Sequence, residues 1–247
     1  MSSITLSLVV LICVFGGALI GIYLHAILPE HHLGSDSKDI VKLGMGLVGT
    51  MSALVLGLLV ASAKGSYDAQ STELTQMSAN IGILDRALTM YGPETKEIRA
   101  MLRGVVGHMT DQMWSSNSPV PPSASGGENI FERIHGLSPK NETQRLLQSQ
   151  ALSIAVDIGK TRWLMYEQAI TAVSLPLLVV LVLWLTVIFI SFGLFAPFNA
   201  TVVSSLLVAA LSVSGAIFLI LEMYSPYSGL IKISSAPLRA SISQPIQ

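Results

Sequence analysis

Three long stretches of this 247-residue chain carry no Asp, Glu, Lys or Arg, and this uneven placement of charge restricts the possible folds. They are residues 1–29, 43–63 and 168–221. A helix of about 20 apolar residues crosses the roughly 30 Å hydrocarbon core of a bilayer. The first two stretches are therefore long enough for one crossing each, and the third for two. The sequence predicts an all-α integral membrane protein with four transmembrane helices.

We expect the four spans at residues 4–28, 43–63, 170–196 and 200–223. Pro197 and Asn199 predict a tight turn between the last two, because proline cannot continue a helix and asparagine tolerates turn geometry. A cleaved signal peptide is the competing interpretation of the first span. Such peptides begin with a basic segment and end at a small-residue cleavage site. Residues 1–3 and 29–30 match neither feature, so an uncleaved span is favoured.

The orientation follows from the basic residues, since cytoplasmic loops carry an excess of Lys and Arg. Four crossings place both termini and residues 65–167 on one side of the membrane. Only Lys38 and Lys42 of the 14 basic residues fall on the other side. We therefore expect a multi-pass protein of the plasma (inner) membrane whose termini and residues 65–167 are cytoplasmic.

The segment between the second and third spans is expected to be a folded helical insert. Its first helix has apolar residues at alternating spacings of three and four, as in a coiled-coil seam: Leu74, Met77, Ile81, Leu84, Leu88 and Tyr91. Gly92 and Pro93 should end that helix. Two more apolar stripes predict two further helices: Ile98, Leu102, Val105, Met109 and Met113, then Leu147, Ala151, Ile154, Ile158 and Met165.

The helices of the insert are expected to continue into the membrane spans. Only Gly65 interrupts the path from the second span to Leu74, and no helix breaker precedes Pro176 on the way into the third span. Residues 115–127, rich in Ser, Pro and Gly, predict a mobile loop. Residues 225–247 are expected to form a cytoplasmic tail.

The second span carries the main candidate site, a face of small residues made of Gly46, Gly49, Thr50, Ala53, Gly57 and Ala61. Small residues at such spacing let helix backbones approach closely within a membrane. Two interpretations stay open: packing within the protein's own bundle, or a helix that surrounds a central pathway in a homo-oligomer. In the second, Lys42 and Lys64 would lie at the two mouths and favour anions. Asp36 and Asp39 are close enough to Lys42 to offset its charge.

Glu222, at the end of the fourth span, is a further candidate. An ionisable group at membrane depth is a functional hypothesis by default. The alternative is an anchor at the interface, either solvated or paired with Lys64 or Lys232.

Several function classes are excluded or disfavoured. The chain has no Gly-rich phosphate loop, nucleophile elbow or His-Glu-x-x-His helix, and its only cysteine, Cys13, lies in an apolar run. We therefore expect neither an enzyme nor a cofactor. The balance of 14 basic and 15 acidic residues disfavours a nucleic-acid partner. No metal site is expected, because the acidic and histidine residues around the first loop match no closed zinc motif: His25, Glu30, His31, His32 and Asp36.

Two blocks of sequence are distinctive. The first runs from Leu28-Pro-Glu-His-His-Leu through Asp36-Ser-Lys-Asp-Ile-Val-Lys-Leu-Gly-Met-Gly to Ala61-Ser-Ala-Lys-Gly-Ser-Tyr67. The second is Leu221-Glu-Met-Tyr-Ser-Pro-Tyr-Ser-Gly-Leu-Ile-Lys-Ile-Ser-Ser235 followed by Pro237-Leu-Arg239. Both resemble a prokaryotic membrane family of unknown function described as bestrophin-like. In that family the residue before Ser225 is commonly acidic, whereas Tyr224 stands here.

The resemblance implies a fold and a function. Bestrophins are pentameric anion channels whose second membrane helix lines the pore and whose helices extend into the cytosol. The first hypothesis is therefore an oligomeric ion channel, anion-conducting by this likeness, with the lipid bilayer, inorganic ions and further copies of the chain as its partners. The alternative is a structural or signalling protein whose helical insert docks a partner through the Leu74–Tyr91 seam or the loop at 115–127.

Overall fold

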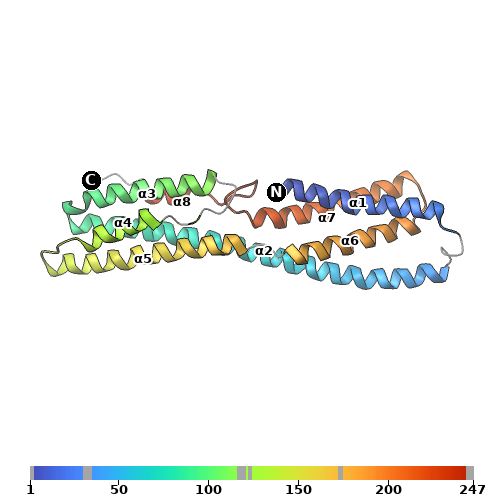
Figure 1. The fold of residues 1–247 in the computed structure, drawn as a ribbon, viewed down its shortest axis with the longest axis horizontal. Coiled ribbons are helices and arrows are strands. Elements are labelled where there is room, and N and C mark those ends of the chain that lie inside the picture. Colours follow the sequence, from blue (N-terminus) through green and yellow to red (C-terminus); the bar gives the residue numbers. More distant parts are fainter. Residues whose placement is uncertain (1–2, 30–34, 116–120, 122–123, 172–174, 243–247) are drawn as a thin grey trace. The chain divides into compact units, whose positions relative to one another are not determined.

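In a computed structural model, the described residues are 3–29, 35–115, 121, 124–171 and 175–242, and they contain helices and no strand (Figure 1). The chain divides into two compact units. The first unit comprises residues 1–65 and 173–224, and the second comprises residues 66–172 and 225–247. One helix, α2, contributes residues to both.

The first unit contains the helices that are long and apolar enough to cross a membrane. They are α1 (Ser3–Ile27), the first part of α2 (Ser35–Tyr91), α6 (Leu175–Phe195) and α7 (Ala200–Met223). Each predicted span therefore corresponds to a helix. The expected third span, at about residues 170–196, corresponds to α6, whereas residues 170 and 171 end the preceding helix and residues 172–174 lie outside the described part. Pro176 instead lies in the first turn of α6, where its missing N–H has no partner to lose.

Helix α1 packs against α6 and α7 (Figure 1). At Gly21 the backbones of α1 and α6 meet so closely that an added Cβ would overlap the carbonyl oxygen of Ile190. From the other side, a Cβ on Gly193 would overlap the carbonyl oxygen of Ala18. The contact to α7 includes a buried hydrogen bond, in which the Ser214 hydroxyl donates to the Ser7 carbonyl at 2.6 Å. Glycine at the first crossing thus lets the two helices touch backbone to backbone.

The predicted turn between α6 and α7 is present, and Asn199 forms its end. Its backbone is extended, and its Oδ1 accepts a hydrogen bond from the Val202 N–H at 2.8 Å. Asparagine is a preferred N-cap because it satisfies one of the free N–H groups at a helix start. The side chain therefore starts α7 immediately after the turn.

Helix α2 runs without a break through Gly65 to Tyr91, as the sequence predicts. At 1.5 Å per residue its 57 residues extend about 86 Å. Gly92 ends it with φ 136°, a conformation that favours glycine. Pro93–Thr95 then form a short 3₁₀ turn, and the Thr95 hydroxyl donates to the Gly92 carbonyl at 2.8 Å.

The second unit is a helical bundle built from residues 66–91 of α2 with α3 (Lys96–Ser115), α4 (Ala124–His135), α5 (Glu142–Thr171) and α8 (Ala236–Ile242). The predicted seam forms its core, and none of these six side chains is more than 4% exposed: Leu74, Met77, Ile81, Leu84, Leu88 and Tyr91. Asp85, which follows Leu84 in α2, accepts two hydrogen bonds from the Arg99 guanidinium of α3 at 2.8 and 2.9 Å. The residues with coiled-coil spacing therefore belong to the core of the second unit.

Two boundaries in the second unit differ from the sequence prediction. The expected loop at 115–127 is too long at both ends, because Ser115 belongs to α3 and residues 124–127 begin α4; residues 116–120, 122 and 123 lie outside the described part. The expected tail is part of the bundle. Trp114 of α3 donates its indole N–H to the Ile233 carbonyl at 2.9 Å, and Leu238 of α8 is fully buried.

Candidate functional site

The candidate residues of the second span share one side of α2. With about 3.6 residues per turn, each residue advances the helix by about 100°, so all eight fall within a sector of about 120°: Lys42, Gly46, Gly49, Thr50, Ala53, Gly57, Ala61 and Lys64. This set is called the small-residue face below. The Thr50 hydroxyl donates to the Gly46 carbonyl at 2.9 Å, so even its polar group is satisfied along the helix.

The small-residue face is turned away from the first unit's interior. Gly49 is half-buried and the other seven residues are exposed. A Cβ added to Gly46, Gly49 or Gly57 would meet no described atom within 4 Å. The α2 side chains that are buried in the unit, Ser52 and Leu59 among them, lie about 120° around the helix. The described residues of the chain's own bundle therefore do not pack against these glycines.

A third side of α2 is covered with large aliphatic side chains. They are exposed, with fractions from 50 to 78%: Leu43, Leu47, Met51, Leu54 and Leu58. Only 11% of the most apolar stretch of α2 is buried, compared with 22 to 33% of the corresponding stretches of α1, α6 and α7. Large aliphatic groups suit contact with lipid tails, whereas small residues suit close approach of another helix. Helix α2 thus presents two exposed surfaces of different character.

Charged groups lie at both ends of the small-residue face. Near its start, the Lys42 ammonium is 3.9 Å from the Asp39 carboxylate, and the two side chains are 63% and 74% exposed. Asp39 is therefore close enough to pair with Lys42, and an exposed pair of this kind contributes about 0–1 kcal/mol. Asp36 lies in the first turn of α2, and its side chain is outside the described part. Lys64 is exposed, 22 residues or about 33 Å further along the helix.

Glu222 is buried in the last turn of α7, with 3% exposure. The predicted alternative of a solvated anchor is therefore wrong within the first unit, and the alternative of a pair with Lys64 or Lys232 stays a prediction. Two residues later, the Tyr224 hydroxyl donates to the Ser62 hydroxyl of α2 at 3.1 Å. A hydrogen bond therefore joins the end of α7 to α2 on a side other than the small-residue face.

The layout of the chain is distinctive. It has four apolar helices, the second of which continues into a helical bundle, and its last segment returns to that bundle. The family profile of the bestrophin-like domain matches residues 12–238, from within α1 to within α8. The chain belongs to the bestrophin-like domain family. It is thus a membrane protein of that family. No curated protein and no solved structure gives a significant match to this bestrophin-like chain.

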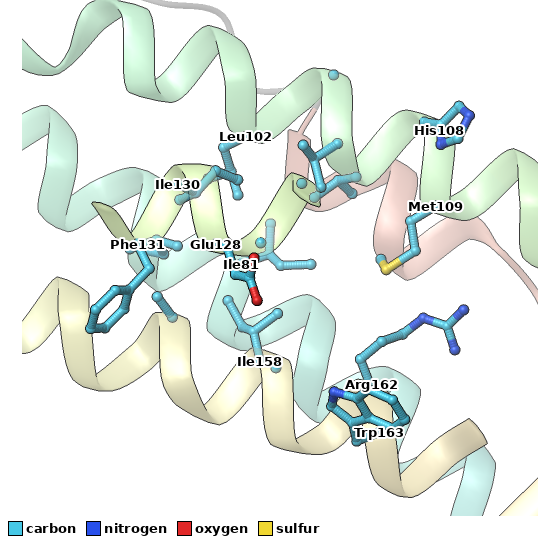
Figure 2. Close-up of a pocket in the computed structure, with 18 of the residues that line it drawn as sticks. Ile81, Leu102, His108, Met109, Glu128, Ile130, Phe131, Ile158, Arg162 and Trp163 are labelled. Atoms are coloured by element: carbon cyan, nitrogen blue, oxygen red, sulfur yellow. The ribbon is translucent and has the colours of Figure 1, made fainter. Parts of the chain in front are cut away.

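A second candidate site was missed by the sequence reasoning. The second unit holds a cavity of about 860 Å³ between α2, α3, α4 and α5 (Figure 2). Ile81 and Ile158 lie between Phe131, toward one end, and Arg162 with Trp163, toward the other. Four helix glycines, Gly104, Gly126, Gly127 and Gly159, also line it. Their positions inside predicted helices or at the edge of the predicted loop were the available signal, because glycine disfavours helix interiors.

Proposed function

We propose that this bestrophin-like protein assembles as a homo-oligomeric ion channel in which the small-residue face of α2 lines or borders the pathway. The observation that carries the proposal is the outward exposure of that face, with Lys42 and Lys64 at its ends. Bestrophins, as the resemblance implies, conduct anions along their second membrane helix. A ring of α2 helices gives the exposed glycines a neighbour that a single chain does not supply.

The charge arrangement favours anions. Residues 43–63 carry no charge, so the pathway between the two lysine rings is formed by Gly, Ala and Thr. An ammonium ring at each mouth attracts anions and repels cations. Asp39 weakens this effect at the Lys42 end.

The orientation is proposed from the basic residues. Both termini and the second unit would be cytoplasmic, because all Lys and Arg residues other than Lys38 and Lys42 then lie on the cytoplasmic side of a plasma membrane. On this topology Lys64 lies at the inner mouth and Lys42 at the outer mouth.

The alternative of a docking stalk loses its main support. The Leu74–Tyr91 seam is covered by the second unit's own helices, and its side chains are buried. A partner therefore cannot use that seam without unfolding the unit. Most of the other proposed docking segment lies outside the described residues.

Conduction is tested with purified protein in planar bilayers under a KCl gradient. We expect an anion-selective reversal potential, and both Lys64→Glu and Lys42→Glu should shift it toward the potassium equilibrium potential. A unit charge at about 4 Å in water contributes about 1 kcal/mol, so each reversal should change the chloride-to-potassium permeability ratio by about fivefold or more.

The control is Lys96→Glu, which reverses an exposed charge on α3 of the second unit. It should leave the reversal potential unchanged. A silent bilayer with correctly assembled protein would contradict channel function. Equal shifts from all three variants would contradict the place of α2 in the pathway while leaving conduction intact.

The topology is tested with reporters fused at residue 247. A fluorescent protein that matures in the cytoplasm should fluoresce. An alkaline phosphatase, which is active only outside the cytoplasm, should show no activity. The reverse result would place the second unit outside and exchange the two mouths.

A further inference from the structure

We propose that the cavity of the second unit binds a single-chain amphiphile with an anionic head group, the head at Arg162 and the chain running toward Phe131. This site is separate from the small-residue face, and the proposal does not depend on conduction.

The size and lining of the cavity fit such a ligand. Its volume of about 860 Å³ lies within the range of about 300–1,000 Å³ that is typical of small-molecule sites. Most of the wall surface is apolar and comes from four helices, including Ile81 of α2, Leu102 of α3, Ile130 of α4 and Ile158 of α5. A long apolar wall with few polar groups suits an alkyl chain.

Glycines help to keep the cavity open. A Cβ added to Gly104, Gly127 or Gly159 would meet no described atom within 4 Å. Gly159 lies inside α5, where glycine costs about 0.5–1 kcal/mol relative to alanine. Gly159 allows no close contact with a neighbour, so its effect on the structure is the space that a side chain would otherwise fill. Gly126, beside them, does allow a close contact, since its added Cβ would lie 3.3 Å from Val105.

The charged groups set the direction of the ligand. Arg162 lies toward the end opposite Phe131 (Figure 2), and burial lowers the pKa of its guanidinium. The Tyr227 hydroxyl, which lies within electrostatic range of Arg162, is buried and makes no hydrogen bond to the described residues. Glu128, near the middle of the cavity, repels an anion there. Glu132 of α4 lines the cavity as well, so carboxylates disfavour an anion on the α4 side, and Arg162 favours one at its own end.

Two head groups share this chemistry, the carboxylate of a free fatty acid and the phosphate of a single-chain phospholipid. Both accept paired hydrogen bonds from a guanidinium. The experiment below distinguishes them by competition.

The test uses the full-length protein in phosphatidylcholine nanodiscs and palmitate that carries a diazirine at its chain end. After photolysis, mass spectrometry should find the label on α4, near Phe131, as well as on lipid-facing helices. Unlabelled palmitate or palmitoyl lysophosphatidate should protect the α4 peptides and not the lipid-facing ones. The competitor that protects at the lower concentration identifies the source of the ligand.

Matched variants test the cavity and the head group separately. Gly159→Leu fills the cavity and should reduce α4 labelling by at least about fivefold, with Gly127→Leu as the second filling variant. Gly107→Leu is the control, because Gly107 also has open space around it and does not line the cavity. Arg162→Gln should raise the concentration of unlabelled palmitate that half-protects the α4 peptides by about tenfold. Lys160→Gln, which removes an exposed charge two residues away, should not.

Three results would overturn the proposal. They are labelling confined to the lipid-facing helices, labelling of α4 that no competitor reduces, and equal effects of Gly159→Leu and Gly107→Leu. Loss of channel conduction with α4 labelling intact would contradict the proposed function alone.

Discussion

The first unit contains two sets of membrane glycines that behave in opposite ways. On α1 and α6, Gly21 and Gly193 lie where two backbones touch, and neither position has room for a Cβ. On α2, Gly49 and Gly57 have no described atom near the position of a Cβ. In the sequence the two sets look alike, because both consist of glycines within apolar helices. The comparison shows that such a pattern identifies a surface suited to close approach without identifying what approaches it.

The difference also separates stability from assembly. The α1–α6 contact is satisfied within one chain, so its glycines act on the folding of that chain. The α2 glycines have no described neighbour at the position of a Cβ within one chain, so they are expected to act on contacts with something outside it. Substitutions at the two sets should therefore change different measurements.

The largest effect is expected from Gly21→Ala and Gly193→Ala. Each places a Cβ less than 3 Å from backbone atoms of the facing helix, which cannot move without separating α1 from α6. We expect a loss of about 3 kcal/mol of stability or more, seen as a lower thermal midpoint of the detergent-solubilised protein. Gly16→Ala is the matched control on α1, because its Cβ meets nothing within 4 Å. Similar midpoints for Gly16→Ala and Gly21→Ala would break the comparison.

An intermediate effect is expected from Gly17→Ala. Its Cβ would lie 3.1 Å from the Thr186 side chain and from the Thr186 carbonyl oxygen. A shift of a few tenths of an ångström relieves this contact, so the cost should be about 1 kcal/mol. The same thermal measurement should place Gly17→Ala between Gly16→Ala and Gly21→Ala. A midpoint below that of Gly21→Ala would show that packing around Thr186 matters more than backbone contact.

The smallest effect on protomer stability is expected from Gly57→Leu. The added side chain meets no described atom, so the stability of the protomer should change by less than about 0.5 kcal/mol. Its effect should appear in assembly size and in conductance, because the leucine occupies the small-residue face. Gly44→Leu is the control, as Gly44 has equally open surroundings and lies on another side of α2. If both variants assemble and conduct like the wild type, the α2 face has no role in assembly.

The four spans and the helical insert could be predicted from the sequence because they depend on local properties. Charge-free runs of sufficient length must cross the bilayer as helices, since lipid offers no hydrogen bonds to an unpaired backbone. The Leu74–Tyr91 seam was predictable for a similar reason: its spacing places six apolar side chains on one side of a helix. The break at Gly92 and the cap at Asn199 follow from the conformations that these residue types favour.

The sequence by itself therefore determined which segments are membrane helices, which are amphipathic and where helices end, because those outcomes depend on residues a few positions apart. Only the tertiary structure decided what each face meets. It placed Glu222 in a buried position, packed the segment after residue 225 against α3, and left an open cavity beside Gly159. It also left the glycines of the small-residue face with no described atom within 4 Å of an added Cβ. Such contacts join residues far apart in sequence, so no local pattern encodes them.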